Sequence, residues 1–270
     1  SLKNSRNLME YGITFIVALL SYLMIGPVSY ALAFPFLEGR VWSYAALFIP
    51  SVLSLASLLV LRKKRFFKDF KALKRGEFSV SLFLLFFSSS FLILSVVSLM
   101  GGATPNNAPF FDKISSLLIS LIFIPIQITM EEYIFRIIVI DAVDRKENEK
   151  RSMGIVISLI SALLFTLPHL FNREVWVEGG TWALLHYFLW GFLAAFSSIL
   201  TEGFEMAVAM HLSNNLVVSI VANYKGSSLS SVSFYLLENE TSSPKAIMAF
   251  VLLFAFELFL FYILKKRGQK

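Results

Sequence analysis

Ionisable and amide side chains are grouped in three short segments of a chain that is otherwise strongly apolar. Residues 130–136 read Met-Glu-Glu-Tyr-Ile-Phe-Arg, residues 165–169 read Phe-Thr-Leu-Pro-His, and residues 211–215 read His-Leu-Ser-Asn-Asn. The groups that could do chemistry are Glu131, Glu132, Arg136, His169, His211 and Asn215. A charge in the hydrocarbon core of a membrane costs about 2.5–3.5 kcal/mol even on the mildest scale. Each charge in an apolar run therefore needs a structural or chemical reason.

Helical spacing sorts these groups by face. Glu132 and Arg136 are four residues apart and stack on one face, in the favourable order of carboxylate before cation. Glu131 is turned by about 100° from Glu132, so we expect that the two carboxylates cannot both fully face one partner. Arg136 would neutralise one of them and leave the other free. His211 and Asn215 are also four apart, which places an imidazole and an amide side by side.

This set of groups suits the hydrolysis of an acyl bond by an activated water molecule. A carboxylate in an apolar cavity holds protons more tightly than one in water, which suits a general base. A histidine opposite it can share the water or pass the proton to a leaving amine, and a neighbouring His and Asn can supply neutral hydrogen-bond donors for the developing oxyanion. The chain contains no Cys and no Gly-x-Ser-x-Gly turn, so no nucleophile from the chain is expected.

Structural alternatives stay open for the same residues. Glu131 and Glu132 could form a purely structural ion-pair network with Arg136, because buried charges usually pair. His169 follows Pro168 near a helix end and could be a satisfied structural histidine.

A metal site is a further alternative. Glu131, His169 and His211 could form a zinc site with two histidines and one carboxylate. The His-Glu-x-x-His helix of metalloproteases is missing, and we expect neither a metal nor a cofactor. Outside the three motifs, His186 is expected to be structural, and Glu257 is an isolated carboxylate in an apolar run whose function the sequence does not indicate.

Composition defines the kind of molecule that must position these groups. The chain has 270 residues, of which 57% are hydrophobic and 16% charged, and its mean hydropathy is +0.72. Soluble domains carry about 25% charged residues, so the composition indicates an integral membrane protein and excludes a disordered chain. The absence of Cys excludes a disulfide scaffold. The basic residues flank apolar runs without a nucleic-acid-binding motif, so no nucleic acid partner is expected.

Eight apolar runs are long enough, or nearly so, to cross a bilayer, which needs about 20 residues of helix. They are 10–34, 41–61, 78–100, 114–141, 153–170, 181–200, 206–222 and 246–264. The sequence thus predicts an all-α polytopic membrane helix bundle with about eight transmembrane helices. We expect residues 1–270 to form a single integral membrane domain, with the catalytic motifs in residues 131–215.

Charge predicts the orientation of the bundle. Segments 3–6, 62–75, 145–151 and 265–270 hold 18 of the 24 Lys and Arg residues. By the positive-inside rule these segments, and both termini, are expected on the cytoplasmic side of the cell membrane. Counting about 1.5 Å per residue from the inner helix ends places Glu131 roughly 15 Å, His169 roughly 24 Å and His211 roughly 8 Å deep. The side to which a shared cavity opens is left undecided.

Taken in this order on three apolar segments, the patterns at 131–136, 165–169 and 211–215 resemble the CPBP family. This is the CAAX-protease and bacteriocin-processing family, which includes the type II CAAX-prenyl endopeptidases. The resemblance covers the 85 residues from 131 to 215 and implies an intramembrane glutamate-type endopeptidase. It further implies roles for the residues: Glu131 activates water, His169 positions that water, His211 and Asn215 form the oxyanion site, and Glu132 and Arg136 support the geometry as a buried pair.

The expected function is therefore an endopeptidase that cleaves a membrane-associated or lipid-anchored peptide. Its expected partners are membrane lipid and a peptide or lipid-modified protein substrate, while the oligomeric state is left open. The rival hypothesis is a non-proteolytic membrane scaffold or chaperone that binds a partner protein through the same cavity. A weaker third hypothesis is a transporter with a proton-coupled Glu/His site, although the chain shows no internal repeat.

Overall fold

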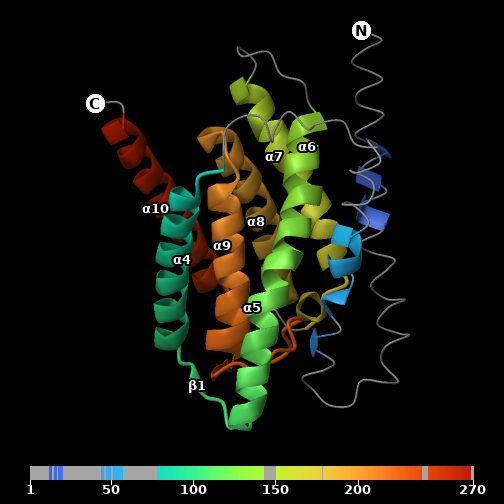
Figure 1. Cartoon of the computed structure of the whole chain (residues 1–270), viewed down its shortest axis with the longest axis vertical. Helices are drawn as coiled ribbons and strands as arrows, with labels where there is room; N and C mark the ends of the chain where they lie inside the picture. The colour runs from blue at the N-terminus through green and yellow to red at the C-terminus, as the bar shows by residue number, and fades with distance from the viewer. Residues whose placement is uncertain are drawn as a thin grey trace.

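The computed structural model describes residues 12–13, 15–16, 18–20, 44–45, 47–49, 51–56, 78–142, 150–177, 179–238 and 243–268. Over these ranges the protein is a bundle of helices with a small sheet at one end (Figure 1). Its long helices are α4 (Val80–Met100), α5 (Phe110–Glu132), α7 (Lys150–His169), α8 (Gly180–Thr201), α9 (Glu205–Leu216) and α10 (Pro244–Gly268). Shorter helices are the π-helical η3 (Tyr133–Ile137) and η6 (Val217–Val221), the 3-10 helix η5 (Arg173–Val175) and α6 (Ile138–Ala142).

The helices agree with the last six of the eight expected spans. Within the described residues, four helical stretches are long and apolar enough to cross a membrane: Val80–Met100, Phe110–Ala142, Gly180–Thr201 and Pro244–Lys266. Two shorter apolar helices, Met153–His169 and Glu205–Val221, correspond to the fifth and seventh expected spans. The protein is a helical membrane bundle. The spans expected at 10–34 and 41–61 lie largely outside the described residues, so the number eight stays a prediction.

Helices α5, η3 and α6 form one continuous rod, and the π-helical turn lies in its middle. The backbone N–H of Ile138 donates to the carbonyl of Tyr133, five residues earlier, in place of the usual four. Such a turn displaces backbone carbonyls from the regular ladder. The hydroxyl of Ser161 on α7 donates to the Phe135 carbonyl at 2.6 Å. This bond ties α7 to the rod a few residues beyond the paired carboxylates.

Small residues allow α7 and α8 to pack closely. A Cβ atom placed on Gly191 of α8 would lie 2.8 Å from the Cα atom of Ala162 and 3.1 Å from the Cβ atom of Phe165 on α7. Close backbone approach at small residues is a general way in which membrane helices associate. Helix α9 lies between α4 and α5 (Figure 1), and the hydroxyl of Ser213 donates to the Phe87 carbonyl of α4 at 3.0 Å.

A three-stranded sheet lies at one end of the bundle (Figure 1). It consists of β1 (Thr104–Pro105), β2 (Ala222–Tyr224) and β3 (Tyr235–Leu237) in the order β1-β3-β2. Strand β1 pairs with β3 in antiparallel register and β2 pairs with β3 in parallel register. The sequence predicts helices alone and gives no sign of this sheet, because each strand has only two or three residues and no alternating pattern of its own.

Candidate active site

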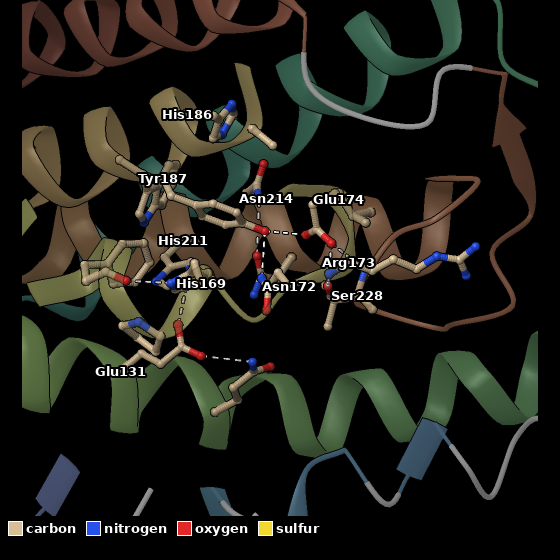
Figure 2. Close-up of a pocket in the computed structure, with 18 of the residues that line it drawn as sticks. Glu131, His169, Asn172, Arg173, Glu174, His186, Tyr187, His211, Asn214 and Ser228 are labelled. Atoms are coloured by element: carbon tan, nitrogen blue, oxygen red, sulfur yellow. Dashed lines mark hydrogen bonds and ion pairs between the residues drawn. The ribbon is translucent and has the colours of Figure 1, made fainter. Parts of the chain in front are cut away.

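Glu131, His169, His211 and Asn215 all line one cavity of about 680 Å³. Glu131 comes from the C-terminal turn of α5, His169 is the last residue of α7, and His211 and Asn215 come from α9. Figure 2 shows Glu131, His169 and His211 turned toward one another from these helices. The structure therefore brings together in one place the four residues for which the sequence suggested a catalytic role.

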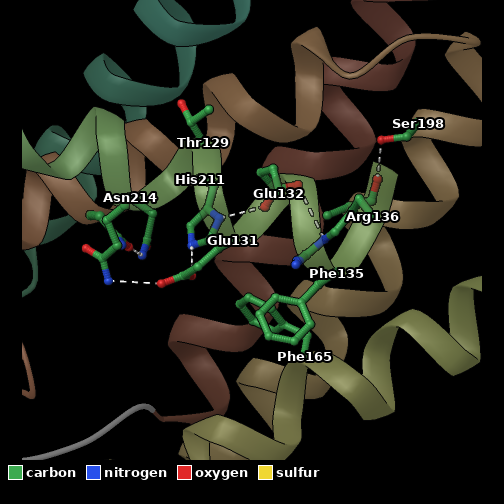
Figure 3. Close-up of polar contacts among 12 residues, drawn as sticks. Thr129, Glu131, Glu132, Phe135, Arg136, Phe165, Ser198, His211 and Asn214 are labelled. Carbon is green, nitrogen blue, oxygen red and sulfur yellow. Dashed lines mark hydrogen bonds and ion pairs between the residues drawn. The ribbon is translucent and has the colours of Figure 1, made fainter. Parts of the chain in front are cut away.

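Glu132 and Arg136 form a buried ion pair next to this cavity. The Nε atom of Arg136 lies 3.3 Å from Oε2 of Glu132, and the two side chains are 0% and 1% exposed (Figure 3). The guanidinium makes no hydrogen bond within the described part of the chain. Its central carbon lies 4.1 Å from the centre of the Phe165 ring. A carboxylate and an aromatic face thus stabilise the buried cation.

His211 contacts both acidic residues of α5, although the two carboxylates were not expected to face one partner fully. Its Nδ1 atom lies 2.7 Å from Oε1 of Glu132, and its Nε2 atom lies 3.6 Å from Oε2 of Glu131 (Figure 3). The reason is the shape of imidazole, whose two nitrogen atoms point in different directions. One ring placed against the helix can therefore reach two carboxylates that are turned by about 100° from each other.

The hydrogen-bond partner of the His211 Nδ1 atom determines whether the Nε2 atom of the same ring can donate a hydrogen bond. A carboxylate oxygen of Glu132 accepts the hydrogen bond, so Nδ1 of His211 carries a proton and donates it. The Nε2 atom can then donate only when the ring carries both protons, as an imidazolium. An oxyanion site built on His211 therefore needs the doubly protonated ring and not the neutral donor that the sequence suggested.

His169 is held in one tautomer by its own helix. Its Nδ1 atom lies 2.6 Å from the carbonyl oxygen of Phe165, which can only accept, so Nδ1 carries the proton. The neutral ring then presents the Nε2 lone pair as an acceptor. The imidazole is packed between two rings, with its centre 4.3 Å from that of Phe165 and 4.1 Å from that of Tyr187. This contact fixes the plane of the ring beside the cavity.

Phe165 is the aromatic side chain that the site residues share. Besides His169 and the Arg136 guanidinium, its ring meets His211 edge-on, with ring centres 5.8 Å apart, and Phe135 edge-on at 5.6 Å. The side chain is 1% exposed. The motif at 165–169 was noted for its histidine, but the structure shows that its phenylalanine packs against both imidazoles and the arginine.

Asn215 and Glu131 each have an amide neighbour that the sequence analysis did not assign. The Nδ2 atom of Asn214 donates to Oδ1 of Asn215 at 3.1 Å, which leaves the Asn215 amide hydrogens as its donors to the cavity. The Nε2 atom of Gln127 donates to Oε1 of Glu131 at 3.0 Å. Gln127 precedes Glu131 by four residues on the same helix, so helical spacing alone could have identified it.

A second buried carboxylate, Glu174, lies in the same cavity toward the sheet end. Its Oε1 atom accepts a hydrogen bond from the Tyr187 hydroxyl, and its Oε2 atom accepts one from the Ser228 hydroxyl and one from the Ser228 backbone N–H at 3.2 Å (Figure 2). The Tyr224 hydroxyl donates to Oε1 at 3.5 Å, and Asn172 donates to Tyr187 at 2.9 Å. No local motif predicted this cluster, because its members come from three separate segments.

The Glu174 cluster fixes the loops around the outer part of the cavity and holds Tyr187 against His169. Burial, and to a smaller degree the nearby Glu174 carboxylate, raises the pKa of the Tyr224 phenol well above its usual value. Tyr224 therefore stays protonated at any physiological pH and acts only as a donor to Glu174. The groups that surround the Glu174 carboxylate in the outer wall of the cavity are thus neutral hydrogen-bond donors.

The zinc alternative requires donor atoms that converge on one point. Among the residues that the structure describes, no group of three His, Asp or Glu side chains has an arrangement that could hold a metal ion. The Nδ1 atoms of His169 and His211 are both bound to protein oxygen atoms instead. Catalysis without a metal stays a prediction, and chelation tests it directly.

A helical membrane bundle with a carboxylate, two imidazoles and an amide around one cavity has the groups that a membrane-embedded hydrolase requires. Comparison with known proteins finds a match in the central segment: residues 113–217 are similar to the family described as type II CAAX prenyl endopeptidase Rce1-like. The resemblance seen in the sequence motifs is thereby confirmed over these residues. The matched segment contains all six residues of the three motifs.

The chain is also similar to a curated bacterial protein. The uncharacterized protein YyaK of Bacillus subtilis (strain 168) is 30% identical over 108 residues. The aligned region covers 40% of this chain and 34% of the relative, so the chain matches about a third of that protein's length. No solved structure matches the chain.

Proposed function

We propose that the protein is a glutamate-type intramembrane endopeptidase, which hydrolyses a peptide bond in a membrane-associated or lipid-anchored peptide. The observation that supports this most strongly is the convergence of Glu131, His169, His211 and Asn215 on one cavity. The match of residues 113–217 to a family of prenyl endopeptidases supports a peptide bond as the target. The four residues would then act as follows.

A water molecule is bound between Glu131 and His169. The Nε2 lone pair of His169 accepts one hydrogen bond from it and the Glu131 carboxylate accepts the other, which directs the water lone pair toward the substrate. As the water oxygen attacks the peptide carbonyl carbon, its proton passes to Glu131. The C–N bond then breaks, and Glu131 returns the proton to the leaving nitrogen. The products are a carboxylic acid and an amine, with one water consumed.

The negative charge that develops on the carbonyl oxygen needs donors that are already in place. Nε2–H of a doubly protonated His211 and the amide hydrogens of Asn215 supply them. Glu132 accepts from Nδ1 of the same ring and keeps the ring oriented. Arg136, paired with Glu132 and stacked on Phe165, holds that carboxylate in place.

Glutamine variants of the two adjacent acids test this assignment. Glutamine at position 131 is isosteric but cannot take the proton, so Glu131→Gln should lower the turnover of a membrane-anchored peptide substrate by about 10²–10⁴-fold without changing the melting temperature. Glu132→Gln is the matched control. Its amide oxygen still accepts from His211, but the Arg136 charge loses its partner, so we expect mainly lower stability. Purified protein in liposomes and a thermal melt provide both measurements.

Two outcomes would contradict the proposal. If Glu132→Gln abolishes turnover at an unchanged melting temperature while Glu131→Gln stays active, the roles of the two acids are reversed. If the wild-type protein binds membrane peptides but hydrolyses none of them, the alternative of a non-proteolytic scaffold or chaperone takes the place of the endopeptidase.

A further inference from the structure

The cavity extends from the candidate catalytic residues to one end of the bundle. Beyond His169 it is lined by residues of the connections that follow α7 and α9, among them Phe171, Arg173, Tyr224, Ser228, Leu229 and Leu237. Tyr224 and Leu237 belong to β2 and β3, so this is the end that carries the small sheet. Figure 1 shows the sheet region at the end of the bundle opposite the last turns of α10.

Toward the other end, the described residues around the site are tightly packed. Ile134 and Ile138, one and two turns beyond Glu131 along the rod, are 0% and 1% exposed. Val139, Ile140 and Ile157 form a further buried cluster beyond them. A peptide or water molecule that approached from that side would have to displace this packing. The open route to Glu131 within the described part of the chain therefore starts at the sheet end.

The end away from the cavity is the basic end. Helix α10 finishes with Lys265 and Lys266, and α7 starts with Lys150 and Arg151. Figure 1 shows the end of α10 and the start of α7 on the same side of the bundle.

Helices α4 and α9 also start at one common end, since the Ser79 backbone N–H donates to Oε1 of Glu205 at 2.7 Å. The segment that directly precedes α4 in the sequence, 62–75, holds eight Lys and Arg residues. Together with 145–151 and 265–270, it accounts for 16 of the 24 basic residues. Among the described residues at the cavity end, the basic ones are Lys113 in the first turn of α5, Arg173 in η5, Lys225 after β2 and Lys245 at the start of α10. Such an asymmetry orients membrane proteins with the basic end in the cytoplasm.

We propose that the cavity receives its substrate from the non-cytoplasmic face of the membrane. The substrate is then a peptide segment of an exported protein, or of a membrane protein exposed on that face, and not a prenylated C-terminus in the cytoplasm. For the reaction, this inference rests on the proposed function. For the side of the membrane, it rests on the position of the cavity and the distribution of charge in this chain.

The lack of cysteine in the chain allows a direct test. Single cysteines are introduced into the full-length protein in intact bacterial cells, and a membrane-impermeant sulfonated maleimide is added outside. The cavity end is probed with Leu229→Cys, which lines the cavity, and with the neighbouring, exposed Ser230→Cys. The matched control at the basic end is Lys266→Cys, which is also exposed. A permeant maleimide and the detergent-solubilised protein establish that all three thiols react when they are reached.

We expect the impermeant reagent to label Leu229→Cys and Ser230→Cys but not Lys266→Cys until the cells are opened. Labelling of Lys266→Cys alone would overturn the inference. Equal labelling of both ends, with a cytoplasmic thiol protein unlabelled in the same cells, would also overturn it. None of these outcomes depends on turnover. A failure of peptide hydrolysis in liposomes contradicts the proposed function alone, while reversed labelling contradicts only the side of entry.

Discussion

The His211 side chain contacts both acidic residues of α5, each through a different ring nitrogen. Nδ1 donates to Glu132, which is itself paired with Arg136, while Nε2 faces Glu131 and the cavity. The pair at 132 and 136 thus orients the imidazole that the proposed mechanism uses, and does so without lining the cavity itself. Single substitutions should therefore distinguish the side chains that contact the substrate from the side chains that keep them in position.

Asn215 is one of the side chains that contact the substrate in the proposed mechanism. Asn215→Ala removes one donor to the oxyanion, and we expect turnover to fall on the order of 10²–10³-fold with little change in KM. Asn214→Ala is the control, because Asn214 donates to the Oδ1 atom of Asn215 and has no contact with the oxyanion in the proposed mechanism, so its loss should cost much less. Steady-state kinetics on a peptide substrate provides the comparison. Weaker peptide binding at unchanged turnover in Asn215→Ala would place this residue in substrate recognition instead.

Removal of metal ions tests the chemistry of the whole residue set. Because Glu131 and His169 can activate water without a metal in the proposed mechanism, turnover should be unchanged after treatment with EDTA and verified removal of metal ions. Loss of activity that is restored only by added zinc would contradict this. Such a result would make Glu131, His169 and His211 ligands of a catalytic ion.

At the scale of elements, the packing of α7 against α8 sets the position of His169. Gly191→Ala would place a Cβ atom 2.8 Å from the Ala162 Cα atom, so the helices must separate. We expect about 1–3 kcal/mol lower stability and a lower turnover, because α7 carries His169. Gly154→Ala is the matched control on α7, since its Cβ atom would meet only Ile199 at an ordinary 3.4 Å. Thermal melts together with peptide hydrolysis would show both effects, and equal behaviour of the two variants would refute the argument.

Helix α10 is attached to α4 by a polar contact inside the membrane. The hydroxyls of Ser89 and Ser90 donate to Oε1 of Glu257 at 2.6 and 2.8 Å, and Glu257 is 0% exposed. The double variant Ser89→Ala/Ser90→Ala leaves this buried carboxyl without its donors, which should cost about 1–3 kcal/mol of stability. Ser88→Ala, whose exposed hydroxyl bonds only to the carbonyl of Leu84 in its own helix, should be neutral. Reversible unfolding in bicelles would measure the difference, and unchanged stability of the double variant would argue against this role of Glu257.

At the scale of the whole molecule, the structure describes six apolar helices, whereas the sequence predicts eight spans. The two further spans can be tested by labelling. The two remaining spans would place loop 35–40 outside and segment 62–75 in the cytoplasm. In the cysteine-free chain, we expect Glu38→Cys to react with an impermeant maleimide in intact cells and Lys71→Cys to react only in opened cells. The same accessibility for both positions would mean that the first part of the chain crosses the membrane a different number of times.

The sequence by itself determined the apolar helices and the residues worth testing. Six of the expected spans correspond to described helices because the length of an apolar run and its charged flanks are local properties of the chain. The three polar motifs could be found for the same reason, since an ionisable group in an apolar run is conspicuous without any knowledge of its neighbours. The pairing of Glu132 with Arg136 followed from helical spacing alone.

The tertiary structure alone decided how these groups meet. Counted along straight helices, Glu131, His169 and His211 lay at different depths, yet they line one cavity. The contact of His211 with both acids depends on how α9 is rotated against α5, and the Glu174 cluster depends on loops that meet only after the helices have packed. Which end of the cavity is open also depends on how the helices pack against one another. These features arise from contacts between segments far apart in the chain, so their geometry is set by the relative position of helices and not by any local pattern of residues.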